Sequence, residues 1–90
     1  MDVIKRSGKH QKFSMSKLRR GIERAARDAK IASMQRRKIV NEVSRSVLLG
    51  MRRRKSVKAV ELRKRILGRL DRSARSAASA WRRFDRKRRR

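Results

Sequence analysis

Residues 3–29 read VIKRSGKHQKFSMSKLRRGIERAARDA, and the change of pattern inside this stretch decides the fold. The first part, VIKRSGKHQKF, contains two short extended segments on either side of Ser7 and Gly8. Glycine readily takes the positive φ that a tight hairpin turn needs, so residues 3–13 predict a β-hairpin. Phe13 is expected to pack under this hairpin.

A helix is expected directly after the hairpin, because the apolar period changes there from about two residues to about 3.6. Apolar side chains fall on one stripe at Leu18, Ile22, Ala25, Ala26 and Ala29. The pattern predicts a helix over residues 17–30, and Ser16 is in position to cap its first turn.

Two further stripes predict a second and a third helix. The second has Ser33 as its expected N-cap and Gly50 as its stop, with apolar residues at Ile39, Val40, Val43, Val47 and Leu48. The third is expected over residues 57–70 with Ser56 as its cap, and it carries Leu62, Ile66 and Leu70. Residues 51–56, MRRRKS, join the two helices and are expected to form a solvated, mobile loop because neighbouring cations repel one another.

A fourth helix is predicted by the stripe of Ala74, Ala77, Ala78, Trp81 and Phe84. The sequence contains no proline, so the third and fourth helices are either two helices with a break or bend at Asp71 or one bent rod. Because Trp81 and Phe84 complete the stripe, a place in the core is favoured over a role as base-stacking platforms.

The predicted fold class is therefore α+β and mostly helical, with an N-terminal β-hairpin followed by about four helices. Ninety residues are enough for one domain with a modest core. We expect this domain over residues 1–85, followed by a basic C-terminal tail at residues 86–90.

Charge limits the classes of partner. The chain has 32 lysines and arginines against 7 acidic residues, a formal net charge of +25. So many like charges in a small domain repel one another, which favours a polyanionic partner that neutralises them. Nucleic acid is the first candidate, and a membrane surface ranks last because the apolar stripes are needed for the core. No apolar run reaches the roughly 20 residues of a membrane span, and MDVIKRSGKHQ lacks the apolar core of a signal peptide. We expect a cytoplasmic protein associated with the nucleoid or with ribosomes.

Several segments resemble the ATP-cone family when they are taken in order. These are Val3-Ile4-Lys5-Arg6-Ser7-Gly8, then SKLRRGIERAARDA at residues 16–29, and Ala80-Trp81-Arg82-Arg83-Phe84, so the resemblance covers about residues 2–84. The chain differs from the family pattern at Ser7, where aspartate is usual, and at Ala59, Arg63, Ala74 and Ala77. It has no cysteine for a zinc ribbon and no catalytic barrel, so the resemblance suggests a stand-alone, highly basic member.

The resemblance implies a regulatory domain of a β-hairpin and four helices that binds ATP or dATP. It places Val3, Lys5 and Arg6 on the strand that lines the nucleotide pocket and Lys17 at the entry of the first helix, facing the phosphates. A helix N-terminus with a nearby lysine suits that role, because its unpaired N–H groups attract anions.

Most of the remaining cations are expected to contact nucleic acid, since few acids offset them. Arginine outnumbers lysine, which suits a bidentate grip on phosphate oxygens. The expected contact residues are Arg36, Arg37, Lys38, Arg52, Arg53, Arg54, Lys55, Lys58, Arg69, Arg72, Arg75, Arg82, Arg83, Arg86, Lys87, Arg88, Arg89 and Arg90. Phosphate contacts carry no base information, so little sequence specificity is expected, and DNA and structured RNA such as ribosomal RNA both remain candidates.

Catalysis is not expected. Most carboxylates have a basic residue three or four positions away, the spacing of helix-surface pairs: Glu23 with Arg27, Arg24 with Asp28, Glu42 with Lys38, Glu61 with Arg65, and Asp71 with Arg75. The single histidine, His10, makes no metal site without other ligands. Two functions follow: a non-enzymatic nucleic-acid-binding protein that responds to nucleotides, or an ATP- or dATP-binding regulatory module that acts on a separate protein.

Overall fold

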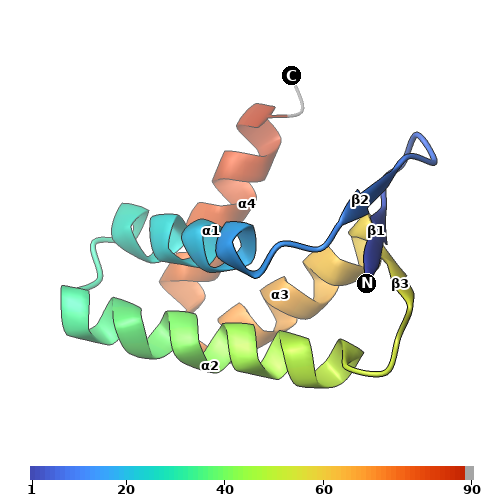
Figure 1. Ribbon diagram of the computed structural model, residues 1–90. Coiled ribbons are helices and arrows are strands. Elements are labelled where there is room, and N and C mark those ends of the chain that lie inside the picture. The colour runs from blue at the N-terminus through green and yellow to red at the C-terminus, as the bar shows by residue number, and fades with distance from the viewer. Residues whose placement is uncertain (89–90) are drawn as a thin grey trace.

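The computed structural model of the chain describes residues 1–88, with side chains through residue 87. Three short strands and four helices follow one another in the order β1 (Asp2–Ile4), β2 (His10–Lys12), α1 (Met15–Asp28), α2 (Ser33–Met51), β3 (Ser56–Lys58), α3 (Ala59–Ser73) and α4 (Arg75–Arg88). Figure 1 shows the helices as the body of the molecule and the strands at one edge. This confirms the predicted class, a mostly helical α+β fold with strands at the N-terminus.

The hairpin forms where the sequence predicted it. β1 and β2 are antiparallel, with Val3 opposite Gln11, and Gly8 takes a φ of 88° in the turn. The turn closes through hydrogen bonds from the Lys5 N–H to the Lys9 carbonyl and from the Gly8 N–H to the Lys5 carbonyl. An L-residue at this φ is strained, so the turn depends on the glycine.

A third strand, β3, was not predicted. It pairs with β1 in parallel, with Val3 opposite Val57, and gives a sheet of order β2-β1-β3. The expectation that Ser56 caps a helix starting at Val57 was therefore wrong. Val57 is 1% exposed and forms part of the core, so burial against β1 favours an extended conformation there, and α3 begins at Ala59.

Helix ends differ from the expected ones by a few residues. Ser14, and not Ser16, caps α1, because its Oγ accepts a hydrogen bond from the Lys17 N–H at 3.2 Å. Ser33 is already the first residue of α2, with Ala32 in the cap position. Gly50 does not stop that helix, which continues to Met51 because the Met51 side chain is buried in the core.

The third and fourth helices are separate, and the chain breaks at Ala74 instead of Asp71. Ala74 is extended, with φ −163° and ψ 95°, while its N–H still donates to the Leu70 carbonyl. This turns α4 back across α1, so α4 contacts both α1 and α3. Residues 86–88 of the expected tail are helical, and the last two residues lie outside the part that the structure describes.

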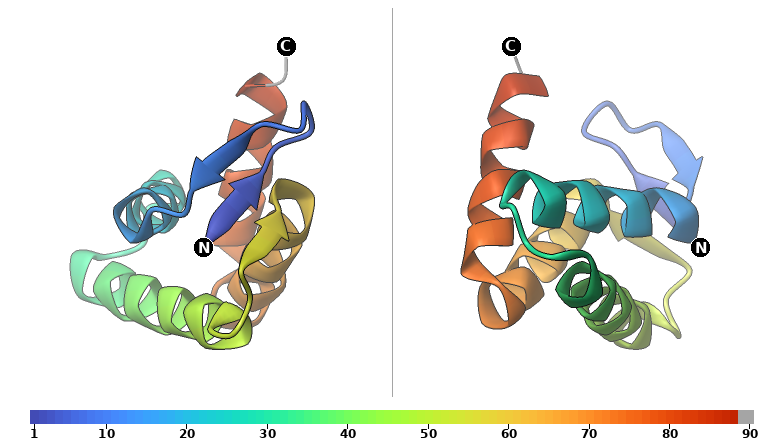
Figure 2. Two further views of the ribbon diagram at one scale, coloured as in Figure 1. Left: turned by 45° about the vertical axis from the view of Figure 1, so that its right-hand side comes forward. Right: turned by 90° about the vertical axis from the view of Figure 1, so that its left-hand side faces the viewer.

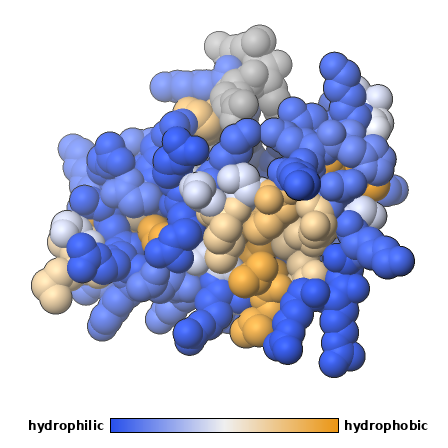
Figure 3. Space-filling view, viewed as in Figure 1, coloured by the Kyte–Doolittle hydropathy of each residue, from blue (hydrophilic) through white to orange (hydrophobic). Residues whose placement is uncertain are grey.

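The core lies where the four helices meet, and Ile22, Val43, Leu70, Ala77 and Ala78 are buried there. Trp81 is partly buried and packs against this core, as predicted, and Phe13 also packs against it. Phe84 was expected in the core as well, but it lines a hollow between α1 and α4. Figure 2 shows β3 and the hairpin beside the start of α3, while α4 rises at a distance from them across the body. Figure 3 shows the face of the molecule seen in Figure 1, which is mostly hydrophilic with an apolar patch near the base of the hairpin.

Candidate functional site

A cationic pocket lies between the hairpin and the start of α3. Its volume is about 660 Å³, and we call it the hairpin pocket. The hairpin contributes Ile4, Lys5, Arg6 and Gly8, and the other wall consists of Lys58, Ala59, Val60 and Arg63.

The parallel pairing of β1 with β3 builds this pocket. Ile4 lies opposite Lys58, so Lys5 and Arg6 leave the sheet at the same edge where α3 begins. Among the described residues, no side-chain hydrogen bond caps the α3 N-terminus, and the first residues of α3 line the pocket. Four cations and a positive helix end make the hairpin pocket suited to an anion.

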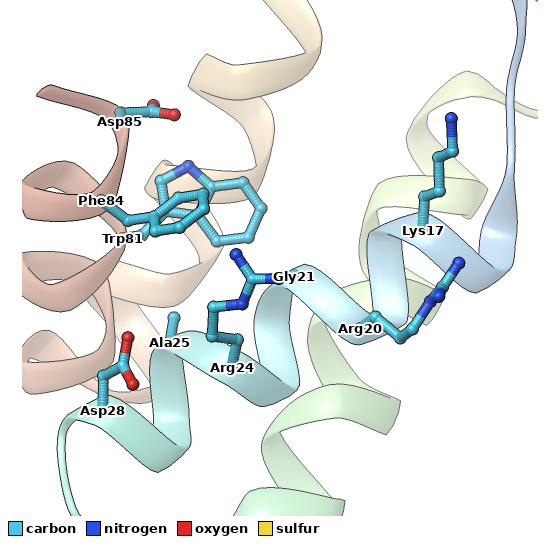
Figure 4. A pocket seen from close by; sticks show the side chains of 9 residues that line it. All are labelled: Lys17, Arg20, Gly21, Arg24, Ala25, Asp28, Trp81, Phe84 and Asp85. Carbon is cyan, nitrogen blue, oxygen red and sulfur yellow. The ribbon is translucent and has the colours of Figure 1, made fainter. Parts of the chain in front are cut away.

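A second hollow lies between α1 and α4, with a volume of about 350 Å³; we call it the α1–α4 hollow (Figure 4). It is lined by Lys17, Arg20, Gly21, Arg24, Ala25, Asp28, Trp81, Phe84 and Asp85. The Arg24 guanidinium lies 4.5 Å from the centre of the Phe84 ring, a cation–π contact. Figure 4 shows Lys17 at the far end of the hollow, well away from the aromatic pair.

One ion pair connects the two cavities. Arg63 of the hairpin pocket and Asp85 of the α1–α4 hollow are joined at 3.0 Å between Nε and Oδ2, and both side chains are partly buried. The two cavities are therefore neighbours, and α3 and α4 are fixed to one another between them.

The structure separates the four residues that the family resemblance marks for nucleotide binding. Lys5 and Arg6 line the hairpin pocket, while Lys17 lines the α1–α4 hollow. Val3 lines neither cavity and packs against the core. Lys58, expected among the nucleic-acid contacts, lies in the hairpin pocket, and Arg63 joins it there.

Acids on other elements engage three of the expected nucleic-acid contacts. Arg36 pairs with Glu23 of α1, Arg54 binds Glu61 of α3 through both guanidinium nitrogens, and Arg82 pairs with Asp71 at 2.8 Å. The expectation that few acids offset these positions was wrong for these three arginines, because each acidic partner lies on another element of the fold.

Most of the other expected contacts are exposed. They are Arg37, Lys38, Arg52, Arg53, Lys55, Arg72, Arg75, Arg83, Arg86 and Lys87. Arg69 is half-buried between helices. The side chain of Arg88 and the whole of Arg89 and Arg90 lie outside the described residues.

Glu23, Glu61, Asp71 and Asp85 form ion pairs with arginines. A hydrogen bond from Arg54 lowers the pKa of Glu61, and bonds from Arg27 and Arg82 likewise lower the pKa values of Glu23 and Asp71. The predicted helix-surface pairs Glu23–Arg27 and Glu61–Arg65 are confirmed, whereas Asp71, which was expected to pair with Arg75, pairs with Arg82. The lowered pKa values mean that these hydrogen bonds stabilise the ionised form of the three carboxylates.

Two further classes of site are absent from the described residues. No group of three or more His, Cys, Asp and Glu side chains that could hold a metal ion occurs there. None of the helices in this part of the chain combines the length and apolar character that a membrane span requires.

Comparison with known proteins gave one family. The family model described as the ATP cone domain matches residues 1–87, nearly the whole chain. No match was found among curated proteins.

Proposed function

Because this chain belongs to the ATP-cone family, whose domains are regulatory, non-catalytic and bind ATP or dATP, we propose that it binds an adenine nucleoside triphosphate in the hairpin pocket. The observation that carries this proposal is the meeting of Lys5 and Arg6 with Lys58 and Arg63 at the start of α3. The triphosphate lies among these cations, and the effector regulates a separate partner.

The charge and size of the pocket support this assignment. A volume of about 660 Å³ is in the range of small-molecule sites, which is about 300 to 1,000 Å³. Glu61, the acid in the first turn of α3, is bound by Arg54 and Arg65, so its charge is already offset. Phosphate groups therefore meet cations beside the positive end of α3.

Calorimetry with ATP and dATP tests the proposal directly. A charge-assisted hydrogen bond contributes about 1.5 to 3 kcal/mol, so Lys5→Ala and Arg6→Ala should each weaken binding about 10- to 100-fold. Lys12→Ala is the matched control, because it removes the same charge from an exposed position of the hairpin outside the pocket. If the pocket variants bind as well as the Lys12 variant, the nucleotide does not sit there.

Lys17→Ala measures how far the nucleotide extends. Lys17 lines the α1–α4 hollow, so a loss of affinity on its removal means that the ligand also reaches this second cavity. Unchanged affinity confines the ligand to the hairpin pocket. GTP at the same salt concentration controls for attraction by the net charge alone.

We also propose that the cations outside this pocket bind nucleic acid through the phosphate backbone. The formal net charge of +25 is far above the need of a nucleotide pocket, and at least four of the seven carboxylates are held by arginines. Exposed cations such as Arg37, Lys38, Arg52 and Arg53 remain for a polyanion. Such a protein would be found with the nucleoid or with ribosomes.

Salt dependence tests this second function. Affinity for duplex DNA or structured RNA should fall by orders of magnitude between about 50 and 200 mM salt, because each neutralised phosphate releases counterions. Fluorescence anisotropy at several salt concentrations gives the slope. A shallow slope would mean that no multi-phosphate interface forms.

A further inference from the structure

Two neighbouring hollows between α2 and α3 form one groove. One is lined by Ser46, Val47, Arg65, Gly68, Arg69 and Arg72, and the other by Glu42, Arg45, Ser46, Leu49 and Arg69. They share Ser46 and Arg69, so they are continuous, and we call them together the α2–α3 groove. It takes in two of the residues expected from sequence to contact nucleic acid and adds Arg45 and Arg65.

Arg69 lies at the centre of this groove. Its Nε is buried and, within the described part of the chain, has no hydrogen-bond partner. A buried donor without an acceptor costs free energy, and one explanation for such a group is a bound anion or water. Arg69 is half-buried and lines both hollows, so an anion bound in the groove would supply this acceptor.

The groove carries a strong excess of positive charge. Four arginines line it, and Glu42 is the carboxylate in its lining. Arg65 pairs with Glu61 at 3.5 Å, but Glu61 is shared with Arg54. An anionic ligand would therefore meet more positive than negative charge along the whole groove.

The arginines of α3 are spaced for a linear polyanion. Arg65, Arg69 and Arg72 follow the i, i+4, i+7 pattern of one helix face, and seven residues of helix rise about 10 Å. Phosphates of one strand of a duplex advance about 3.4 Å each along its axis, so this row faces about three of them. Gly68 lies between the arginines with open space around its Cα, which leaves room for a backbone.

The groove lies on the opposite face of α3 from the hairpin pocket. At about 100° per residue, Ala59, Val60 and Arg63 fall on one side of the helix, and the groove residues 65, 68, 69 and 72 on the other. The two sites can therefore be altered independently.

We propose that the α2–α3 groove seats the phosphodiester backbone of a nucleic acid, with Arg65, Arg69 and Arg72 on successive phosphates and Arg45 on the opposite wall. The proposal rests on the nucleic-acid function above and states where on the surface that function resides.

The test compares two variants of equal charge. Arg69→Gln/Arg72→Gln removes two cations from the groove, and Lys9→Gln/Lys12→Gln removes two exposed cations of the hairpin that are not among the expected nucleic-acid contacts. Each lost phosphate contact lowers the slope of log affinity against log salt by about 0.9 on duplex DNA, so the groove variant should lose nearly two. The control variant should lose less than half as much. Anisotropy on duplex DNA, on structured RNA and on polyglutamate gives the slopes.

Each result has one meaning. Equal loss in both variants would overturn the groove proposal and leave a diffuse cationic surface, and tighter binding of polyglutamate than of either nucleic acid would make the groove a site for an acidic protein. A shallow slope for the unaltered protein would overturn the nucleic-acid function itself. DNA and RNA are separated by which of the two loses affinity in the groove variant. Unchanged ATP affinity by calorimetry shows that the groove variant remains folded.

Discussion

Replacing Val57 by alanine should loosen the strand that ties the two walls of the hairpin pocket together. Val57 is the middle residue of β3, lies opposite Val3 of β1, and is 1% exposed. Its side chain therefore joins the sheet to the helical core, which makes it a sensitive probe of this junction.

The size of the effect follows from the burial. The change removes two buried carbons at about 0.8 kcal/mol each, and the cavity left behind adds to this, for a total of about 2 to 3 kcal/mol. A chain of 90 residues has a free energy of unfolding of about 5 to 13 kcal/mol, so the loss is a large fraction. At about 4 to 8 °C per kcal/mol, the Tm should fall by roughly 10 °C or more.

Urea unfolding followed by circular dichroism measures this loss. The m-value should stay constant, since the same surface is exposed on unfolding. Met34→Ala is the control, because Met34 is 83% exposed on α2 and its truncation should change the free energy by less than about 0.5 kcal/mol. If Val57→Ala costs no more than the Met34 variant, β3 does not anchor the sheet and the reasoning fails.

Further changes probe the ion pairs and the glycines. Arg54→Ala should raise the pKa of Glu61 towards 4.5, because the hydrogen bond from Arg54 is the main cause of its lowering; NMR titration would show no rise if that pair were not formed in solution. The pKa of Glu61 is lower in the folded protein than in the unfolded chain. Its contribution to stability is therefore complete above the unfolded-state pKa and is lost as the pH falls through the folded-state pKa. The unaltered protein should accordingly have a lower Tm in acid, and a higher Tm there would contradict this reasoning. Gly68→Ala should stabilise the protein by about 0.5 to 1 kcal/mol, whereas Gly21→Ala should gain less because its Cβ would lie 3.1 Å from the Trp81 ring; equal gains by urea unfolding would show that the ring can move aside.

The helical part of the fold could be predicted because each helix carries its own apolar stripe. Ile22 in α1, Val43 in α2 and Leu70 in α3 all belong to stripes visible in the sequence, and all three are fully buried. β3 could not be predicted in this way. It contains three residues with one buried side chain, and its partner strand lies more than half of the chain away.

Local signals were also insufficient at helix ends. Ser14 and Ser16 are equally good caps by residue type, and the packing of the first turn selects Ser14. The break at Ala74 has no turn residue to mark it. Small buried residues such as Ala77 and Ala78 let α4 lie close to its neighbours, and that packing places the break.

The part of the candidate site that lies on the hairpin could be predicted from the sequence. The family resemblance pointed to Lys5 and Arg6, which meet in the hairpin pocket, but Lys58 and Arg63 reach it through the unpredicted strand. Rules for neighbours within one helix likewise cannot find the pair of Arg54 with Glu61, which joins a loop to α3. Contacts between distant segments depend on the tertiary fold.

The parallel pairing of β1 with β3 has a consequence for the order of events during synthesis. β1 leaves the ribosome first, but its parallel partner β3 is made only after both α1 and α2. Closing so long a loop carries an entropic cost. The Arg63–Asp85 ion pair forms only after α4 has been made. A nascent chain therefore has α1 and α2 before it has a complete hairpin pocket, and the proposed effector binding becomes available only after residues 56–63 have been translated.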